Sequence, residues 1–383
     1  MSLSGATGIA RSKPLLFLAS GGALFAQARR PIAALFIALL TIFATVQVSS
    51  PAMANPRLLV DMDSGEVLFA EEAGQPWHPA SLTKMMTAYM AFAAIKAGRV
   101  SLDTLVKVSR NAWNEAPAKS GLAIGSSITM KDALYVMLVK SANDIAVAVG
   151  ETISGSEKDF VAEMNKMADA MGLSATHFVD PNGLHADGQV TSARDLAMLG
   201  LYIHRDYPQY LGMFSTEKVR LGKASLESNN GLLEHFQGTT GMKTGYICAS
   251  GLNIVATVQR DGRNLLAVVL GASSARERNE MAAELVLKGL AGSVPGTGKS
   301  VVQLSNIDAE PVNMRAQICG KQAKQYIAER QAAFPMGLKG HPSYLTDEIE
   351  GEVYTATDLG VVVDIPIPRP RPDWAPAAVA IAD

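Results

Sequence analysis

The chain has 383 residues, of which 48% are hydrophobic and 18% are charged, with 34 basic residues, 36 acidic residues and two cysteines. This composition excludes a wholly disordered chain, because so many aliphatic residues can bury a core, and it excludes a small disulfide-rich scaffold. The net charge of −2 lacks the basic surplus that nucleic-acid phosphates attract, so we expect no nucleic-acid partner.

Residues 1–54 have the composition of an export signal. They hold four basic residues and no acidic one, and an apolar stretch from Ile32 to Val48 precedes the small residues Pro51-Ala52-Met53-Ala54. This combination is typical of a secretory signal peptide, so we predict cleavage after Ala54 and an exported protein. The alternative is an uncleaved anchor, since an apolar run of about 17 residues is at the short limit for crossing a bilayer.

The chain after this leader begins with two short apolar runs on either side of a turn containing Gly65. They predict a β-hairpin over 57–61 and 66–70. Residues 80–97 repeat apolar residues at helical spacing and predict a helix that begins close to Ser81. The region up to residue 235 is predicted to be mostly helical, with the clearest repeats at 133–149, 160–171 and 193–203.

A second strand pair follows the helical region. Residues 252–258 and 265–271 flank the turn Asp261-Gly262 and predict a hairpin, and residues 277–290 predict a final helix. Strands near both ends of a helical middle predict one sheet built from the two chain ends. We therefore expect an α/β (α+β) fold, with an antiparallel sheet flanked by helices and an inserted all-helical subdomain.

The first motif with catalytic potential is Ser81-Leu82-Thr83-Lys84. Residues three apart on a helix share a face, so the Lys84 amine can reach the Ser81 hydroxyl and act as the base that a serine nucleophile needs. A lysine with an ordinary pKa of about 10.4 is protonated near neutrality. The mechanism therefore requires burial or another cation to lower the pKa of Lys84.

Two further motifs strengthen this interpretation. Ser141-Ala142-Asn143 is expected in a turn, where the hydroxyl can relay a proton and the amide can bind a peptide group. Lys243-Thr244-Gly245 precedes the strand predicted at 252–258. It offers a cation for a carboxylate, a hydroxyl donor and a glycine that lets a ligand approach the backbone. Each motif alone is common, but their order and joint spacing favour one catalytic site.

The three motifs and the blocks around them resemble the serine-type D-alanyl-D-alanine carboxypeptidases. These low-molecular-mass penicillin-binding proteins share S-x-x-K, S-x-N and K-T-G with the serine β-lactamases. The resemblance covers about residues 57–290 and is carried by residues 79–87, 177–184, 191–197 and 241–246. It implies the β-lactamase/DD-peptidase-like fold and a periplasmic enzyme without cofactor. Its substrates would be peptidoglycan stem pentapeptides, and β-lactam antibiotics would acylate it.

The resemblance also implies catalytic roles for the first two motifs. Ser81 would attack the carbonyl carbon of the penultimate D-alanine, and Lys84 would act as its base. Ser141 would relay a proton to the leaving amine, and Asn143 would orient the acyl side of the substrate. Hydrolysis of the acyl-enzyme would complete the removal of the terminal D-alanine.

The substrate-binding residues implied by the resemblance come later in the chain. Lys243-Thr244-Gly245 would meet the terminal carboxylate, and the backbone N–H groups of Ser81 and Tyr246 would form the oxyanion hole. An arginine that meets the carboxylate in the family matches Arg278, with Arg276 as the rival.

Three other functions remain as alternatives. A murein DD-endopeptidase uses the same residues on a cross-linked substrate, so the motifs leave this possibility open. A class A β-lactamase needs a deacylating glutamate in an E-x-x-L-N context, which none of the six glutamates between the second and third motifs has. A non-enzymatic penicillin-binding or murein-binding scaffold is disfavoured because every catalytic position is intact.

Histidines and cysteines support further predictions. The six histidines show no metal-ligand spacing, so we expect no metal. Cys248 and Cys319 are predicted to form a disulfide in an oxidising periplasm, and closing a loop of about 70 residues would contribute roughly 4 kcal/mol in the chain-entropy model. Two free thiols are the alternative.

We divide the chain into a signal peptide (1–54), a DD-peptidase catalytic domain (55–291), a C-terminal extension of unknown role (292–363) and a Pro-rich disordered tail (364–383). The extension is predicted to hold one helix, at 314–333. The end of the tail lacks the basic and aromatic residues of an interfacial helix, which argues against membrane attachment there. Peripheral association with the inner membrane through another part of the protein stays open.

Overall fold

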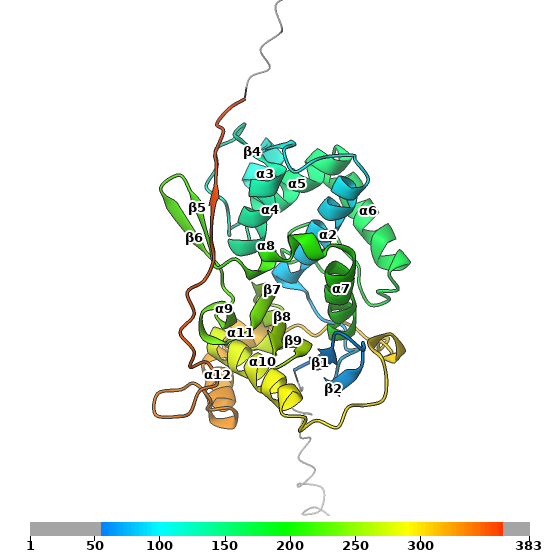
Figure 1. Cartoon of the computed structure of the whole chain (residues 1–383), viewed down its shortest axis with the longest axis vertical. Helices are drawn as coiled ribbons and strands as arrows, with labels where there is room; N and C mark the ends of the chain where they lie inside the picture. The colour runs from blue at the N-terminus through cyan, green and yellow to red at the C-terminus, as the bar shows by residue number, and fades with distance from the viewer. Residues whose placement is uncertain (1–54, 363–383) are drawn as a thin grey trace, which may run out of the picture. The chain divides into compact units, whose positions relative to one another are not determined.

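The centre of the fold is a five-stranded antiparallel sheet (Figure 1). The structure, a computed structural model, describes residues 55–362, so the predictions for 1–54 and 364–383 lie outside the described residues. The strand order is β2 (Val67–Glu71), β1 (Arg57–Asp61), β9 (Arg263–Ala272), β8 (Gly251–Arg260), β7 (Thr239–Ile247). Both predicted hairpins are confirmed. The prediction of one sheet built from two distant parts of the chain is also confirmed, since its strands come from both ends of residues 55–291, the predicted catalytic domain, called the catalytic region below.

Helices cover both faces of the sheet, because successive residues of a strand point to opposite faces. α10 (Ala275–Leu290) packs against the odd-numbered apolar residues of β9, such as Leu265. α7 (Ala193–Asp206) packs on the other face, where Gly200 permits close approach to Leu266. Both helices agree with the helices predicted from the sequence.

The chain between β2 and β7 forms the helical part of the catalytic region. Besides α7, its helical elements are η1 (Ala80–Thr83), α2 (Lys84–Lys96), α3 (Arg110–Asn114), α4 (Met130–Val139), α5 (Asn143–Ser154), α6 (Glu157–Ala170), η2 (Pro208–Tyr210), α8 (Gly212–Ser215) and α9 (Leu232–His235). Serine or threonine side chains cap the N-termini of α3, α4 and α6. The prediction that this inserted part is all-helical is wrong, because it also holds two short strand pairs, β3 (Leu105–Lys107) with β4 (Ser127–Thr129), and β5 (Lys218–Leu221) with β6 (Ala224–Glu227). Strands of three or four residues are too short for the alternating pattern by which a strand is recognised in a sequence.

The helical repeat over 133–149 is divided into two helices. α4 ends at Val139, α5 begins at Asn143, and Ser141 between them has a φ of +61°. This left-handed conformation is strained for a residue other than glycine. It is maintained only where surrounding contacts stabilise it. The S-x-N motif therefore lies at a sharp break between two helices.

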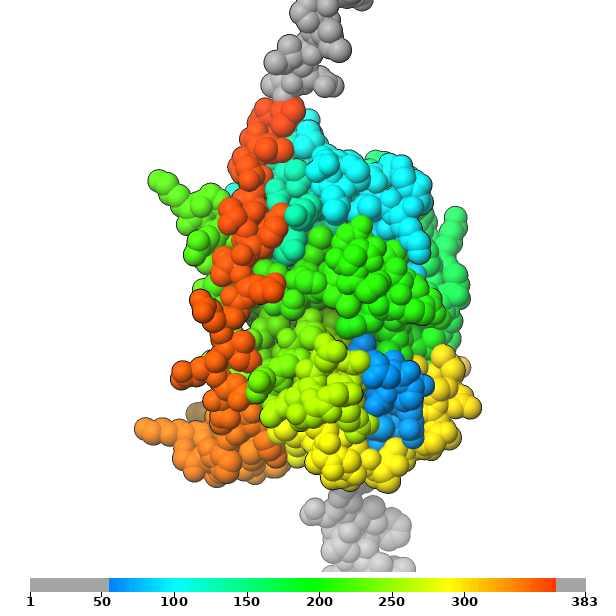
Figure 2. Space-filling view, viewed as in Figure 1, coloured from blue at the N-terminus to red at the C-terminus, as the bar shows by residue number. Residues whose placement is uncertain are grey.

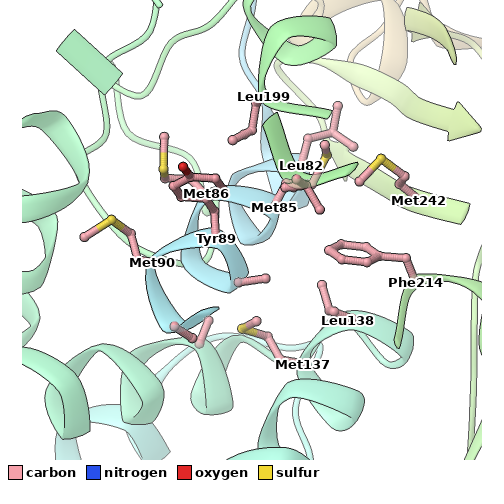
Figure 3. Close-up of a cluster of buried hydrophobic side chains, with 14 of the residues drawn as sticks. Leu82, Met85, Met86, Tyr89, Met90, Met137, Leu138, Leu199, Phe214 and Met242 are labelled. Carbon is pink, nitrogen blue, oxygen red and sulfur yellow. The ribbon is translucent and has the colours of Figure 1, made fainter. Parts of the chain in front are cut away.

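A methionine-rich cluster joins the helices to the sheet (Figure 3). Met85 and Met86 on α2, Met137 on α4, Phe214 on α8 and Met242 on β7 are all buried in it. Methionine side chains are unbranched and adapt to irregular gaps. Because α2 directly follows the S-x-x-K motif and β7 carries K-T-G, this cluster fixes the two motifs relative to each other.

The C-terminal extension lies against the catalytic region and adds a few side chains to its core. Its elements are η3 (Val301–Gln303), α11 (Arg315–Ile318), α12 (Ala323–Ala333) and β10 (Val353–Ala356). The helix predicted at 314–333 is interrupted near Gly320, a residue type with low helix propensity. β10 pairs in parallel with β5, and Figure 2 shows the later part of the extension in orange and red along one side of the surface. No helix in the described range is long and apolar enough to cross a membrane.

Candidate active site

The S-x-x-K motif places its lysine in direct contact with its serine. Ser81 lies on η1, and Lys84 is the first residue of α2. The Nζ atom of Lys84 is 3.0 Å from Ser81 Oγ, 2.7 Å from Asn143 Oδ1 and 2.5 Å from the main-chain oxygen of Asn182. The lysine is completely buried. This geometry gives the Lys84 amine three oxygen partners and no contact with bulk water.

Burial is the main electrostatic influence on Lys84. It lowers the pKa of Lys84 well below the usual value of 10.5, and the positive charge of Lys243 lowers it further. The carboxylates of Asp180, Asp144 and Glu115 act in the opposite direction. The sequence required burial or another cation to lower the pKa of Lys84. The structure provides both.

The S-x-N motif connects the other two motifs. Ser141 Oγ accepts a hydrogen bond of 3.0 Å from Lys243 Nζ. Asn143 accepts from Lys84 through its side-chain oxygen, donates through its side-chain nitrogen to the Ala116 oxygen, and donates through its backbone N–H to the Ala118 oxygen. Asn143 is thereby fixed from three sides.

The K-T-G motif lies within β7, at the edge of the five-stranded sheet. The sequence indicated a strand edge here but did not delimit β7. Lys243 is buried, and this burial, with the charge of Arg278, lowers its pKa from 10.5 to about 7. A Cβ atom at Gly245 would lie 2.9 Å from the Pro79 oxygen and 3.0 Å from the Ser81 nitrogen. Glycine therefore allows β7 to lie directly against the start of η1.

A cavity of about 350 Å³ opens between the helical part and β7. Residues of all three motifs line it, among them Ser81, Ser141, Asn143, Thr244, Gly245 and Tyr246. A larger cavity of about 780 Å³ beside α7 contains none of the motif residues. Among residues 55–362, no group of three or more His, Cys, Asp or Glu side chains could hold a metal ion.

The structure distinguishes the two candidate arginines. Arg278 lines the 350 Å³ cavity, is nearly fully buried and donates to the Asn229 oxygen. Burial lowers its pKa to about 10. Arg276 instead donates to the main-chain oxygens of Phe334 and Met336 in the C-terminal extension. Only Arg278 is therefore placed to meet a ligand in this cavity.

A disulfide connects the rim of the cavity to the extension. Cys248, just after β7, is joined to Cys319, just after α11, with their Cα atoms 5.6 Å apart. Tyr246 lines the cavity, is 52% exposed, and its hydroxyl lies 3.3 Å from Cys319 Sγ. The extension therefore reaches the edge of the site through this bridge.

The sequence did not identify several residues that support the site. Asn253 on β8 donates to the oxygens of His78 and Pro79, and so holds the segment before Ser81 on the sheet. Asn182 and Glu115 hydrogen-bond to each other at 2.9 Å. Asn182 stood within a block typical of the family, whereas Glu115 had no local signal.

The site contains two serine–lysine pairs, Ser81 with Lys84 and Ser141 with Lys243, and both serines line the same cavity. This arrangement is typical of enzymes that transfer an acyl group through an active-site serine. The chain belongs to the D-alanyl-D-alanine carboxypeptidase family, whose model matches residues 44–274. The β-lactamase-like fold expected from the sequence agrees with similar solved structures of penicillin-binding proteins.

Three similar proteins illustrate this relationship. The chain is 36% identical over 240 residues to D-alanyl-D-alanine carboxypeptidase DacD from Escherichia coli (strain K12), covering 61% of this chain and 62% of that protein. Penicillin binding protein 6B from E. coli superposes with a TM-score of 0.59 at 36% identity, over 62% of this chain and 77% of that one. Penicillin-Binding Protein D2 from Listeria monocytogenes, in a cefotaxime-bound form, has a TM-score of 0.56 and 31% identity, over 62% and 97%. The chain thus spans less than two thirds of the length of its first curated relatives.

Proposed function

We propose that this chain is a serine-type D-alanyl-D-alanine carboxypeptidase that removes the terminal D-alanine from murein stem pentapeptides. The observation that carries the proposal is the fully buried Lys84 amine, 3.0 Å from Ser81 Oγ. Only a lysine with a depressed pKa can accept a serine proton near neutrality, and the burial of Lys84 depresses its pKa.

The first step forms the acyl-enzyme. A neutral Lys84 amine has two N–H groups, which donate to Asn143 Oδ1 and the Asn182 oxygen, so its lone pair is directed toward Ser81. Ser81 Oγ attacks the carbonyl carbon of the penultimate D-alanine while its proton passes to Lys84. The backbone N–H groups of Ser81 and Tyr246 bind the developing oxyanion, an interaction worth about 3 to 4 kcal/mol per donor in other acyl-transfer enzymes.

The second step expels the terminal D-alanine. As the C–N bond breaks, Ser141 gives its hydroxyl proton to the leaving nitrogen. The protonated amine of Lys243, which hydrogen-bonds to Ser141 Oγ, then resupplies that proton. In deacylation, water attacks the acyl carbon and one of its protons passes to Ser81 Oγ as the ester bond breaks. Lys84 releases the proton that it took in the first step and Lys243 takes up one, so both lysines return to their starting states with no net change in protons.

The terminal carboxylate of the substrate would bind at the β7 side of the cavity. Lys243 and Arg278 supply positive charge there, and the Thr244 hydroxyl supplies a donor. Both cations are buried, so their attraction for a carboxylate is less screened by water than at a surface. This arrangement favours a substrate that ends in a free carboxylate.

The same serine would be acylated by β-lactam antibiotics, since a similar penicillin-binding protein was solved in cefotaxime-bound form. A periplasmic location is part of the proposal. It is supported by the predicted leader and by the bridge between Cys248 and Cys319, because disulfides persist in oxidising compartments.

The decisive experiment incubates the protein with a stem pentapeptide and with cross-linked muropeptides, and follows the products by mass spectrometry. We expect D-alanine release from the pentapeptide. Ser81→Ala should reduce this activity by about 10⁴-fold or more and abolish labelling by a fluorescent penicillin. Ser64→Ala, in the exposed turn before β2, is the matched control and should behave as the wild type.

Two results would contradict the proposal. Labelling or turnover that survives in Ser81→Ala would exclude Ser81 as the nucleophile. Cleavage of the cross-linked muropeptides with no D-alanine released from the pentapeptide would instead identify a DD-endopeptidase.

A further inference from the structure

The segment 115–118, just after α3, faces the cavity from the helical side. Pro117 and Ala118 line the cavity. The oxygens of Ala116 and Ala118 accept the two N–H donors of Asn143, at 2.9 and 2.8 Å. The segment thus fixes one of the two residues that accept hydrogen bonds from Lys84.

Glu115, at the start of this segment, contacts the other acceptor. Its Oε2 atom accepts a 2.9 Å hydrogen bond from Asn182 Nδ2, and the main-chain oxygen of Asn182 accepts the 2.5 Å bond from Lys84 Nζ. Asn182 is 1% exposed, and its side-chain oxygen accepts from the Leu184 N–H. Glu115 is therefore connected to the Lys84 amine through a single intervening residue, Asn182.

We propose that Glu115 is a positioning residue for Lys84. Its carboxylate holds Asn182 so that the Asn182 oxygen receives one N–H of Lys84, and its negative charge biases Lys84 toward the protonated form. The proposal rests on the proposed function, because it assumes that Lys84 is the base for Ser81. Glu115 acts through Asn182 and is not among the residues that line the cavity.

Four charged groups from different elements act on Lys84. Lys243 on β7 disfavours its protonated form, whereas Asp180, Asp144 on α5 and Glu115 favour it. Asp144 is compensated by hydrogen bonds from the backbone and side chain of one serine, and Asp180 by two backbone N–H groups. Glu115 has a single neutral amide donor.

The surroundings of Glu115 make its charge responsive to pH. Partial burial raises its pKa above the usual 4.5, and the negative charge of Glu157 on α6 raises it further. The Asn182 hydrogen bond and Lys84 oppose this rise, and Asp180 adds to it. The Glu115 carboxylate thus has two separable effects. It accepts the hydrogen bond from Asn182, and its negative charge favours the protonated form of Lys84. Two substitutions distinguish these effects.

The test measures the rate of acylation by a fluorescent penicillin from about pH 5 to about pH 10, a range that spans the titration of perturbed lysines. Glu115→Gln keeps an acceptor for Asn182 but removes the charge. We expect its maximal rate to match the wild type, with the acid limb of the profile moved to lower pH, because Lys84 loses its proton more readily. Glu115→Ala also loses the acceptor, and its maximal rate should fall by about 10²-fold.

Glu163→Gln is the matched control, because it removes a carboxylate from an exposed pair with Arg99 on the same helical part. Its profile should superpose on that of the wild type. If Glu115→Gln also superposes on the wild type while the wild type is acylated, the inference is wrong and the proposed function stands. If the wild type forms no acyl-enzyme, the proposed function fails and the inference fails with it. Should Glu115→Ala unfold, the Glu115→Gln profile alone decides.

Discussion

The catalytic cleft and the C-terminal extension differ in how they place polar and charged groups. The cleft buries charged side chains, whereas the extension has few buried hydrophobic residues and is attached largely by polar contacts, a strand pairing and a disulfide. In the cleft, Lys84, Lys243 and Arg278 are 0%, 2% and 3% exposed. Burying charges that have no carboxylate partner in direct contact lowers the stability of the folded protein. The same burial lowers the pKa values of Lys84 and Lys243. Polar contacts at the surface of the catalytic region attach much of the extension.

Among the described residues of the extension, only Val301, Met314 and Ala356 are buried hydrophobic residues. Other attachments include the disulfide, the pairing of β10 with β5, polar contacts to α10, and hydrogen bonds that link Asn306 and Leu304 to α7 and to the residue that caps it. Glu277 of α10 forms an ion pair with Arg330 at 2.7 Å, and Glu280 accepts hydrogen bonds from residues 343 and 344. The same helix presents Arg278 to the cavity. The extension therefore supports one side of α10, while the opposite side of the same helix contributes Arg278 to the cavity.

After the loss of the nucleophile itself in Ser81→Ala, the largest effect on activity is expected from Lys243→Gln. The substitution removes a buried cation from the proposed binding site of the substrate carboxylate, so kcat/KM for a D-alanine-terminated peptide should fall by about 10² to 10³-fold. In the wild type, the pKa of about 7 means that Lys243 loses its charge as the pH rises above 7, and KM should rise over that range. Steady-state kinetics against pH would measure both, with Lys140→Gln as the control next to Ser141.

The same pKa predicts a dependence of stability on pH. The pKa of Lys243 is about 7 in the folded protein, against 10.5 as its usual value. Between these values the unfolded chain binds the proton and the folded protein does not, so this residue contributes a gain in stability as the pH rises from about 7 toward 10.5. Thermal unfolding of the wild type should therefore show a steeper rise in Tm over this range than that of Lys243→Gln. Parallel profiles would contradict the depressed pKa.

A smaller effect is expected when the two arginines of α10 are compared. Arg278→Ala should lower kcat/KM by about 10 to 100-fold, because it removes a cation that lines the cavity. Arg276→Ala should leave kcat/KM close to the wild-type value and lower the free energy of unfolding by about 1 to 2 kcal/mol, through its lost bonds to the extension. Kinetics and denaturant unfolding on both variants provide the test. Equal losses of activity would show that the extension side of α10 matters as much as the cleft side.

The smallest effect on activity is expected from the double variant Cys248→Ser, Cys319→Ser. The bridge spans 71 residues of sequence, and its loss should lower the free energy of unfolding by up to about 4 kcal/mol in the chain-entropy model. The acylation rate by penicillin should change by about two-fold or less, since Ser81 and Lys84 are held by other contacts. An acylation rate reduced by about 10²-fold, the scale of a lost catalytic interaction, would show that the extension belongs to the catalytic machinery.

Local sequence patterns were sufficient for the elements that carry the motifs. The spacing of Ser81 and Lys84 places both on one helical face whatever the rest of the chain does, and the structure shows their contact at 3.0 Å. The two hairpins and the final helix also follow from short-range periodicity. The strand β7 was not delimited, because the K-T-G segment is buried at an edge and lacks a simple alternation.

Contacts between distant segments could not be derived in this way. Asn182 is 98 positions from Lys84, and Glu115 is 67 from Asn182. No periodicity links such positions, since their proximity depends on how helices pack across the sheet. The choice between Arg278 and Arg276 likewise depended on which side of α10 faces the cavity and which faces the extension.

The sequence by itself determined the motifs, their order, the elements that carry them and hence the family and the expected chemistry. The tertiary structure alone decided the protonation behaviour of the site, because the pKa of Lys84 or Lys243 depends on burial and on charges contributed by remote segments. Spacing along a helix is a local property of the backbone, whereas desolvation arises only when the whole chain has packed around a side chain.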